Sequence, residues 1–349
     1  MTRTLFLHVG PPKTGTTSIQ TFFRDNAAAF LRRGLFRPIT GTERKSHFHW
    51  NLVKAFHPGQ FPSEMLDKLA NEVRENNFPP KILISAEAFA VHMGEPAYVA
   101  AVKDFCQRLG YRLHILAYIR PQVPMLNSLY SQHVKKLRPV PPIADFIESE
   151  CASGHHDYLS LFAAVLDDPD IDVTLRPFNR STFRQGLVFN MCEVLGLDSA
   201  SEALTEPETS NVSPGPRTIA ALMQLRRQVK KRFPALDNES LKSVAWPLIN
   251  VTSGLGWNDE KFGAMSPGEQ EALAGRFAVA NEQLAQRIWS APWSQVFSPE
   301  ECTAPPSNPF DPAAASADVR EEFDAFIEQA MDVVADFATT YHSRNGARR

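Results

Sequence analysis

Two glycines near the N-terminus, Gly10 and Gly15, constrain the fold of this chain more than any other feature. They follow a short apolar run at residues 5–9 and precede residues 16–33, where apolar side chains recur at helical spacing. The order strand, glycine turn, helix presents backbone amides at a helix N-terminus, where they and the helix dipole attract an anion. Glycine permits the tight backbone path that such a turn needs. We therefore predict an anion-binding loop from Gly10 to Thr17.

The alternation of strand and helix continues along the first part of the chain. Further strands are predicted at residues 81–85, 113–118 and 171–175, and helices at residues 63–77, 96–109 and 181–195. Such alternation implies crossover connections, and hence a largely parallel sheet with helices on both faces. Ligands of such sheets bind at the carboxyl ends of the strands. We expect an α/β fold of the phosphate-binding-loop (P-loop) type.

Helical patterns dominate the remaining part of the chain. Helical spacing occurs at residues 216–233, 269–290 and 319–341, with loops rich in proline and small residues at 205–216 and 302–317. We expect a single domain over residues 1–349, with an α/β nucleotide-binding core at 1–204 and a helical extension at 205–349.

Composition narrows the choice of partners and compartment. The chain has 36 Lys and Arg against 39 Asp and Glu, and neither half is dominated by one sign, which argues against nucleic-acid binding. Four scattered cysteines without CxxC spacing suggest neither disulfides nor a zinc site. The apolar run before Pro11 is too short for a signal peptide or a membrane span. We expect a soluble, cytoplasmic protein without a transmembrane segment.

The position of its lysine distinguishes this loop from that of nucleoside triphosphatases. Thr16 follows Gly15 where those enzymes carry lysine, and the lysine lies three positions earlier, at Lys13. The strands at 81–85 and 113–118 lead into Glu87 and Arg120, and neither ends in an aspartate that would obviously hold magnesium. This pattern favours metal-free chemistry on a less charged group.

The segment Pro12-Lys-Thr-Gly-Thr-Thr17 resembles the 5′-phosphosulfate loop of sulfotransferases that use 3′-phosphoadenosine 5′-phosphosulfate (PAPS) as the donor. The resemblance implies that Lys13 contacts the bridging oxygen of the departing phosphate. It also implies a set of residues that bind the 5′-phosphate, namely Thr14, Gly15, Thr16, Thr17 and Ser18.

A second motif of the same family is an arginine at a strand end with a serine eight residues later. Arg120 and Ser128 have this spacing, and the resemblance assigns both to the donor's 3′-phosphate. A guanidinium suits phosphate because its planar fork supplies paired, charge-assisted hydrogen bonds, to which serine adds a neutral donor. The spacing is weak evidence alone and gains weight from the loop that precedes it.

Other features bear on the acceptor, a hydroxyl or an amine. Residues 173–197 resemble the later strand and helix of bacterial and carbohydrate sulfotransferases. Ser18 stands where the cytosolic branch has a tryptophan, and that branch's C-terminal Arg-Lys-Gly segment is missing from the sequence. We therefore expect a carbohydrate or glycolipid acceptor rather than a phenol or steroid.

Glu87 is the first candidate for the base that accepts the acceptor's proton. It follows the strand at 81–85, at the same sheet edge as the loop, and some carbohydrate sulfotransferases resemble this arrangement. A surface glutamate that caps the next turn is the alternative interpretation. His49 is the second candidate and His47 the third, because histidine titrates near neutral pH and their loop could reach the acceptor.

Two other functions stay open on the sequence. A P-loop kinase or nucleotide phosphatase fits the glycine spacing, and magnesium dependence would distinguish it. A non-catalytic nucleotide-binding module fits if no base lies near the loop.

Overall fold

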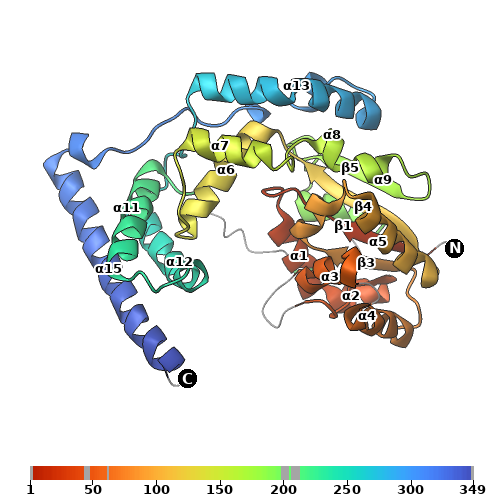
Figure 1. Cartoon of the computed structure of the whole chain (residues 1–349). Coiled ribbons are helices and arrows are strands. Elements are labelled where there is room, and N and C mark those ends of the chain that lie inside the picture. The colour runs from red at the N-terminus through yellow and green to blue at the C-terminus, as the bar shows by residue number, and fades with distance from the viewer. Residues whose placement is uncertain (1–2, 43–47, 61–62, 198–203, 206–212, 347–349) are drawn as a thin grey trace. The chain divides into compact units, whose positions relative to one another are not determined.

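A computed structural model describes residues 3–42, 48–60, 63–197, 204–205 and 213–346 of the chain (Figure 1). Its five strands form one parallel sheet in the order β2-β3-β1-β4-β5. The strands are β1 (Thr4–His8), β2 (Leu35–Phe36), β3 (Lys81–Ser85), β4 (Arg112–Ile119) and β5 (Asp172–Pro177). The predicted α/β fold with a helical C-terminal region is confirmed. Because β1 lies between β3 and β4, the loops that follow these three strands meet at one sheet edge.

Ten α-helices belong to the described part of residues 3–197. They are α1 (Thr16–Asp25), α2 (Ala27–Arg32), α3 (Trp50–Ala55), α4 (Glu64–Glu75), α5 (Pro96–Arg108), α6 (Gln122–Lys135), α7 (Ile143–Ala152), α8 (Tyr158–Leu161), α9 (Ala163–Leu166) and α10 (Leu187–Val194). Two 3-10 helices also occur there, η1 (Pro58–Gln60) and η2 (Glu87–His92).

Two of the predicted helices differ in the structure, and α3, α7, α8 and α9 were not predicted. The helix expected over residues 16–33 is divided at Asn26, whose side-chain amide donates to the carbonyl oxygens of Phe22 and Thr205. The helix expected from residue 181 begins only at Leu187, because Gly186 precedes it with φ of 101°, outside the helical region.

The later helices are α11 (Pro216–Arg232), α12 (Asn238–Gly254), α13 (Pro267–Trp289), α14 (Trp293–Val296) and α15 (Ala317–Gly346), with 3-10 turns η3 (Pro299–Glu301) and η4 (Pro312–Ala314). Three of them match the predicted helices, whereas α12 and the short α14 were not predicted. Among the described residues, no helix is both long and apolar enough to cross a membrane.

The chain divides into two compact units. The first comprises residues 1–122, 150–209 and 276–301, and contains the sheet. The second comprises residues 123–149, 210–275 and 302–349, and within it α15 packs against α11 and α12. Residues 276–301, which the sequence pattern places in the helical extension, thus belong to the first unit.

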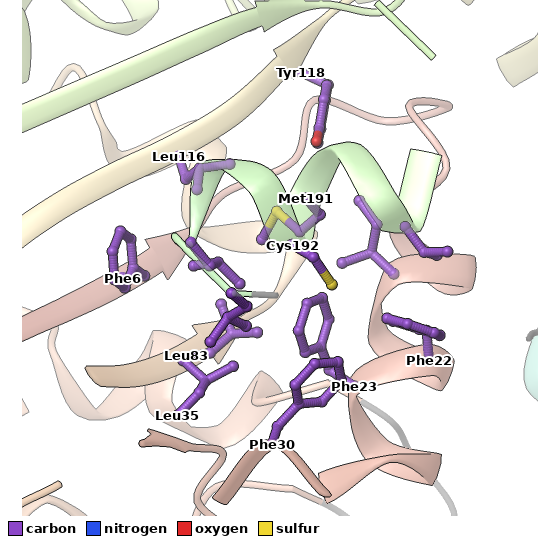
Figure 2. Packing of buried hydrophobic residues seen from close by; sticks show 14 residues of the cluster. Phe6, Phe22, Phe23, Phe30, Leu35, Leu83, Leu116, Tyr118, Met191 and Cys192 are labelled. Atoms are coloured by element: carbon purple, nitrogen blue, oxygen red, sulfur yellow. The ribbon is translucent and has the colours of Figure 1, made fainter. Parts of the chain in front are cut away.

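A cluster of buried side chains joins α1, α2 and α10 to the sheet in the first unit (Figure 2). Phe22 meets Phe23 and Phe30 edge to face, with ring centroids 5.3 and 5.6 Å apart. Met191 and Cys192 of α10 belong to the same cluster. Burial of each large apolar side chain stabilises the fold by about 1.5–3 kcal/mol relative to exposure. The cluster therefore holds α1, and with it the loop that precedes α1, firmly against the sheet.

Candidate functional site

The loop between β1 and α1 follows a constrained backbone path. Lys13 and Gly15 have φ of 67° and 73°, in the left-handed region. A β-carbon on Gly15 would lie 2.2 Å from Cδ2 of Leu187, and one on Gly10 would lie 2.2 Å from Cγ2 of Thr16. A side chain at either position would therefore displace a neighbouring side chain, and the left-handed φ of Gly15 favours glycine there in any case. Lys13 adopts a conformation that costs an ordinary residue roughly 1–2 kcal/mol, and such strain clusters at functional sites.

The start of α1 is suited to an external anion. Gly15 occupies the cap position and has no side chain that could accept from the first-turn amides. Thr17 is exposed and Ser18 half-buried in that turn. The buried Thr14 instead braces the loop, because its Oγ1 donates to the carbonyl oxygen of Pro11 at 2.8 Å.

Arg120 reaches this loop from the end of β4. Its Nη1 donates to the carbonyl oxygen of Lys13 at 3.1 Å, so two motifs that are 107 residues apart meet. Its guanidinium lies 5.8 Å from the ring centroid of Phe178, and the Tyr158 hydroxyl donates to its carbonyl oxygen at 2.8 Å. Burial lowers the pKa of Arg120, but an arginine keeps its charge at neutral pH.

Tyr158 and Phe178 are support residues that the sequence reasoning missed. The amide of Phe178 donates to the carbonyl oxygen of Ile119 at 2.7 Å, which extends the β4–β5 pairing by one residue. The position of Phe178 just past β5, at the carboxyl edge, is a signal that could have identified it. Tyr158 comes from a short helix after a turn, and its position carries no such signal.

Glu87 also meets the loop. It lies just past β3, its side chain is exposed, and its Oε1 accepts a hydrogen bond from Oγ1 of the buried Thr16, the first residue of α1. The geometry therefore brings the first candidate base to the helix that follows Lys13.

His49 has a different environment. It is fully buried, its Nδ1 accepts from the Ser85 amide at 3.0 Å, and its Nε2 lies 2.9 Å from the carbonyl oxygen of Pro38. Burial is the main cause that lowers its pKa to about 4. Both ring nitrogens thus bind the backbone, which gives His49 a structural role and argues against it as the base. His47, the third candidate, lies outside the described residues.

A buried polar cluster lies at the ends of β1 and β3, next to the turn that contains Glu87, and was not anticipated from the sequence. Oγ of Ser85 lies 2.8 Å from Nδ1 of His8 and accepts from Nε2 of Gln20 at 3.1 Å. Burial lowers the pKa of His8 to about 4. His8 and Ser85 are register partners at the ends of β1 and β3, so a polar residue ending each apolar strand was the available signal.

The predicted donor-site residues are therefore not all brought together within one unit. Lys13 to Ser18, Glu87 and Arg120 belong to the first unit, whereas Ser128 lies half-buried on α6 in the second. Within the part of the chain that the structure describes, no group of three or more His, Cys, Asp and Glu side chains is arranged to hold a metal ion.

Comparison with known proteins adds no relative: no protein-family model, curated protein or solved structure gives a significant match to this chain. The fold defines an α/β protein with a parallel sheet, and any assignment of function depends on the geometry of the site itself.

Proposed function

We propose that this protein is a PAPS-dependent sulfotransferase. The observation that carries the proposal is the hydrogen bond from Arg120 to the carbonyl oxygen of Lys13, which joins the two motifs that the family resemblance assigns to the two ends of one donor. The bare cap at Gly15 supports an anion beside α1.

The residues of the first unit suit this donor. Lys13 and the first-turn amides of α1 would hold the 5′-phosphosulfate, and Arg120 the 3′-phosphate. The resemblance also assigns Ser128 to the 3′-phosphate, but Ser128 belongs to the second unit, so the proposal rests on the residues of the first unit. Cationic and amide groups suffice for both anionic ends, so the proposal needs no metal ion.

In the proposed reaction, the acceptor oxygen forms a bond to sulfur while the bond from sulfur to the bridging phosphate oxygen breaks. The bridging oxygen keeps the electron pair, and the Lys13 ammonium stabilises its developing negative charge. The acceptor's proton passes to Glu87. The Oε1 atom of Glu87 accepts a hydrogen bond from Thr16, and its other carboxylate oxygen would accept the proton. The products are a sulfated acceptor and adenosine 3′,5′-bisphosphate.

We infer a carbohydrate or glycolipid as the acceptor, because the glutamate in the base position and residues 173–197 resemble the carbohydrate branch. The four cysteines have free thiols, which is consistent with a reducing, cytoplasmic location.

Two measurements test the proposal. Calorimetry should detect binding of adenosine 3′,5′-bisphosphate with undiminished affinity in excess chelator. Labelled PAPS, offered with fractions of oligosaccharides, glycolipids, peptides and small metabolites, should transfer label to one acceptor class.

Two outcomes would contradict the proposal. Preference for ATP with magnesium, without binding of the bisphosphate, would favour the kinase or nucleotide phosphatase. Tight binding of the bisphosphate without transfer to any fraction would favour the non-catalytic module.

A further inference from the structure

The second unit contains a pocket of about 400 Å³, within the range of small-molecule sites. One side is formed by a face of α11, with Ile219 and Met223 among its residues, and three aromatic side chains complete the walls: Tyr130, Phe262 and Phe310. The rings of Tyr130 and Phe262 are stacked with centroids 6.5 Å apart. The walls therefore offer a mainly apolar, partly aromatic surface.

The polar side chains of this pocket are few, and of these the Tyr130 hydroxyl donates to the carbonyl oxygen of Pro141 at 3.3 Å. Gln224, Arg227 and Ser307 line it, and among the described residues none of their side chains makes a hydrogen bond or ion pair. No acidic side chain occurs among the described lining residues, so the Arg227 charge is not neutralised within the pocket. By contrast, Arg217 lies near Phe310 and is engaged with Glu322.

Apolar walls together with one unneutralised arginine favour a ligand that has an apolar body and a single negative charge. A guanidinium binds a planar, two-oxygen anion through paired hydrogen bonds, and an amide and a hydroxyl can satisfy the remaining acceptor sites. A single cation matches a single negative charge, whereas a phosphate dianion calls for more positive charge. The apolar walls would bury the rest of such a ligand.

We propose that the pocket binds a small carboxylate with an apolar alkyl or aryl body, with the carboxylate at Arg227 and the body between α11 and the aromatic side chains. All of its lining residues belong to the second unit, so the inference is independent of the proposed transferase activity.

The test is calorimetry on the full chain with octanoate, and with octan-1-ol as the uncharged molecule of equal chain length. Octanoate should bind at one site per chain and more tightly than octan-1-ol. Arg227→Gln should weaken octanoate binding about tenfold, as expected for loss of one charge-assisted contact, and leave octan-1-ol unaffected. Ala220→Phe, which places a ring in the pocket, should abolish binding of both.

Lys230→Gln is the matched control, because Lys230 is an exposed cation on the same helix that does not line the pocket. Thermal unfolding checks that each variant is folded, and Arg227→Gln is a change at an exposed position. Equal loss in Arg227→Gln and Lys230→Gln, unchanged binding in Ala220→Phe, or no binding of octanoate would each overturn the proposal.

Discussion

The left-handed backbone of Lys13 leads to a prediction that separates conformation from charge. Lys13 is not a glycine, yet its φ is 67°. If position 13 carries lysine for its ammonium group, then Lys13→Gly should remove the backbone strain and also remove the cation that the proposed transfer needs. Lys13→Ala should remove the same function and keep the strain, so the comparison of the two variants isolates the backbone contribution.

The difference in free energy of unfolding between Lys13→Gly and Lys13→Ala follows from two opposing effects. The left-handed conformation costs alanine roughly 1–2 kcal/mol, and glycine avoids this cost. Glycine loses more backbone entropy on folding, which offsets roughly 0.5–1 kcal/mol of the gain. Lys13→Gly should therefore have a free energy of unfolding about 0.5–1 kcal/mol higher than Lys13→Ala.

Thr21, inside α1, provides a control of opposite sign. There the glycine variant should be less stable than the alanine variant by about 1 kcal/mol, as in any helix interior. Hydrogen exchange of peptides from β1 and β3 reports the stability of the first unit separately, which a single unfolding curve of a two-unit chain does not. Transfer from labelled PAPS should be slowed similarly in both Lys13 variants. A glycine variant that is less stable than the alanine variant at position 13 would refute the reasoning.

Three further predictions concern the surrounding residues. Arg120→Ala should weaken bisphosphate binding by roughly 2–4 kcal/mol by calorimetry, because a charge pair to phosphate is lost; unchanged affinity would exclude Arg120 from the site. Glu87→Gln should slow transfer roughly 100-fold or more at unchanged donor affinity, whereas normal turnover there, with collapse of turnover in a folded His49→Ala variant at unchanged donor affinity, would make His49 the base. Burial lowers the pKa values of His8 and His49 from 6.5 to about 4, so the fold is more stable when both imidazoles are neutral. This stabilisation is present above pH 6.5 and is lost toward pH 4, at about 1.4 kcal/mol per pH unit for each histidine; a pH slope of unfolding that His8→Asn leaves unchanged would contradict it.

The sequence predicted the sheet well because its signals are local. Three of the four predicted strands are apolar runs and the fourth, at residues 171–175, alternates apolar and polar residues; each is present within two residues of the predicted bounds. β2 was missed because it consists only of Leu35 and Phe36, too short to show periodicity. The helix α12 was missed because Pro247 lies in its interior, which weakens the helical pattern.

Only part of the candidate site could be predicted from local sequence signals. The loop residues are contiguous, and Glu87 and Arg120 follow strands whose ends meet at one edge. The hydrogen bond between Arg120 and Lys13, the burial of His49 and the division of the chain at Gln122 all depend on tertiary contacts between distant segments. No periodicity encodes those contacts, and Ser128 consequently belongs to a different unit from Arg120.

The environments of Glu87 and His49 also explain why residue type alone does not show which of them is the better candidate base. Histidine is favoured because its usual pKa lies near neutral pH, but burial removes that advantage from His49 and the backbone occupies both of its nitrogens. Glu87 is exposed at the sheet edge, and its contact with Thr16 fixes one carboxylate oxygen beside the loop. A carboxylate that is held at one oxygen and open at the other can receive a proton without breaking a structural contact. His49 would have to leave the Ser85 amide or the Pro38 carbonyl, so a role in proton transfer would cost part of the fold behind the site.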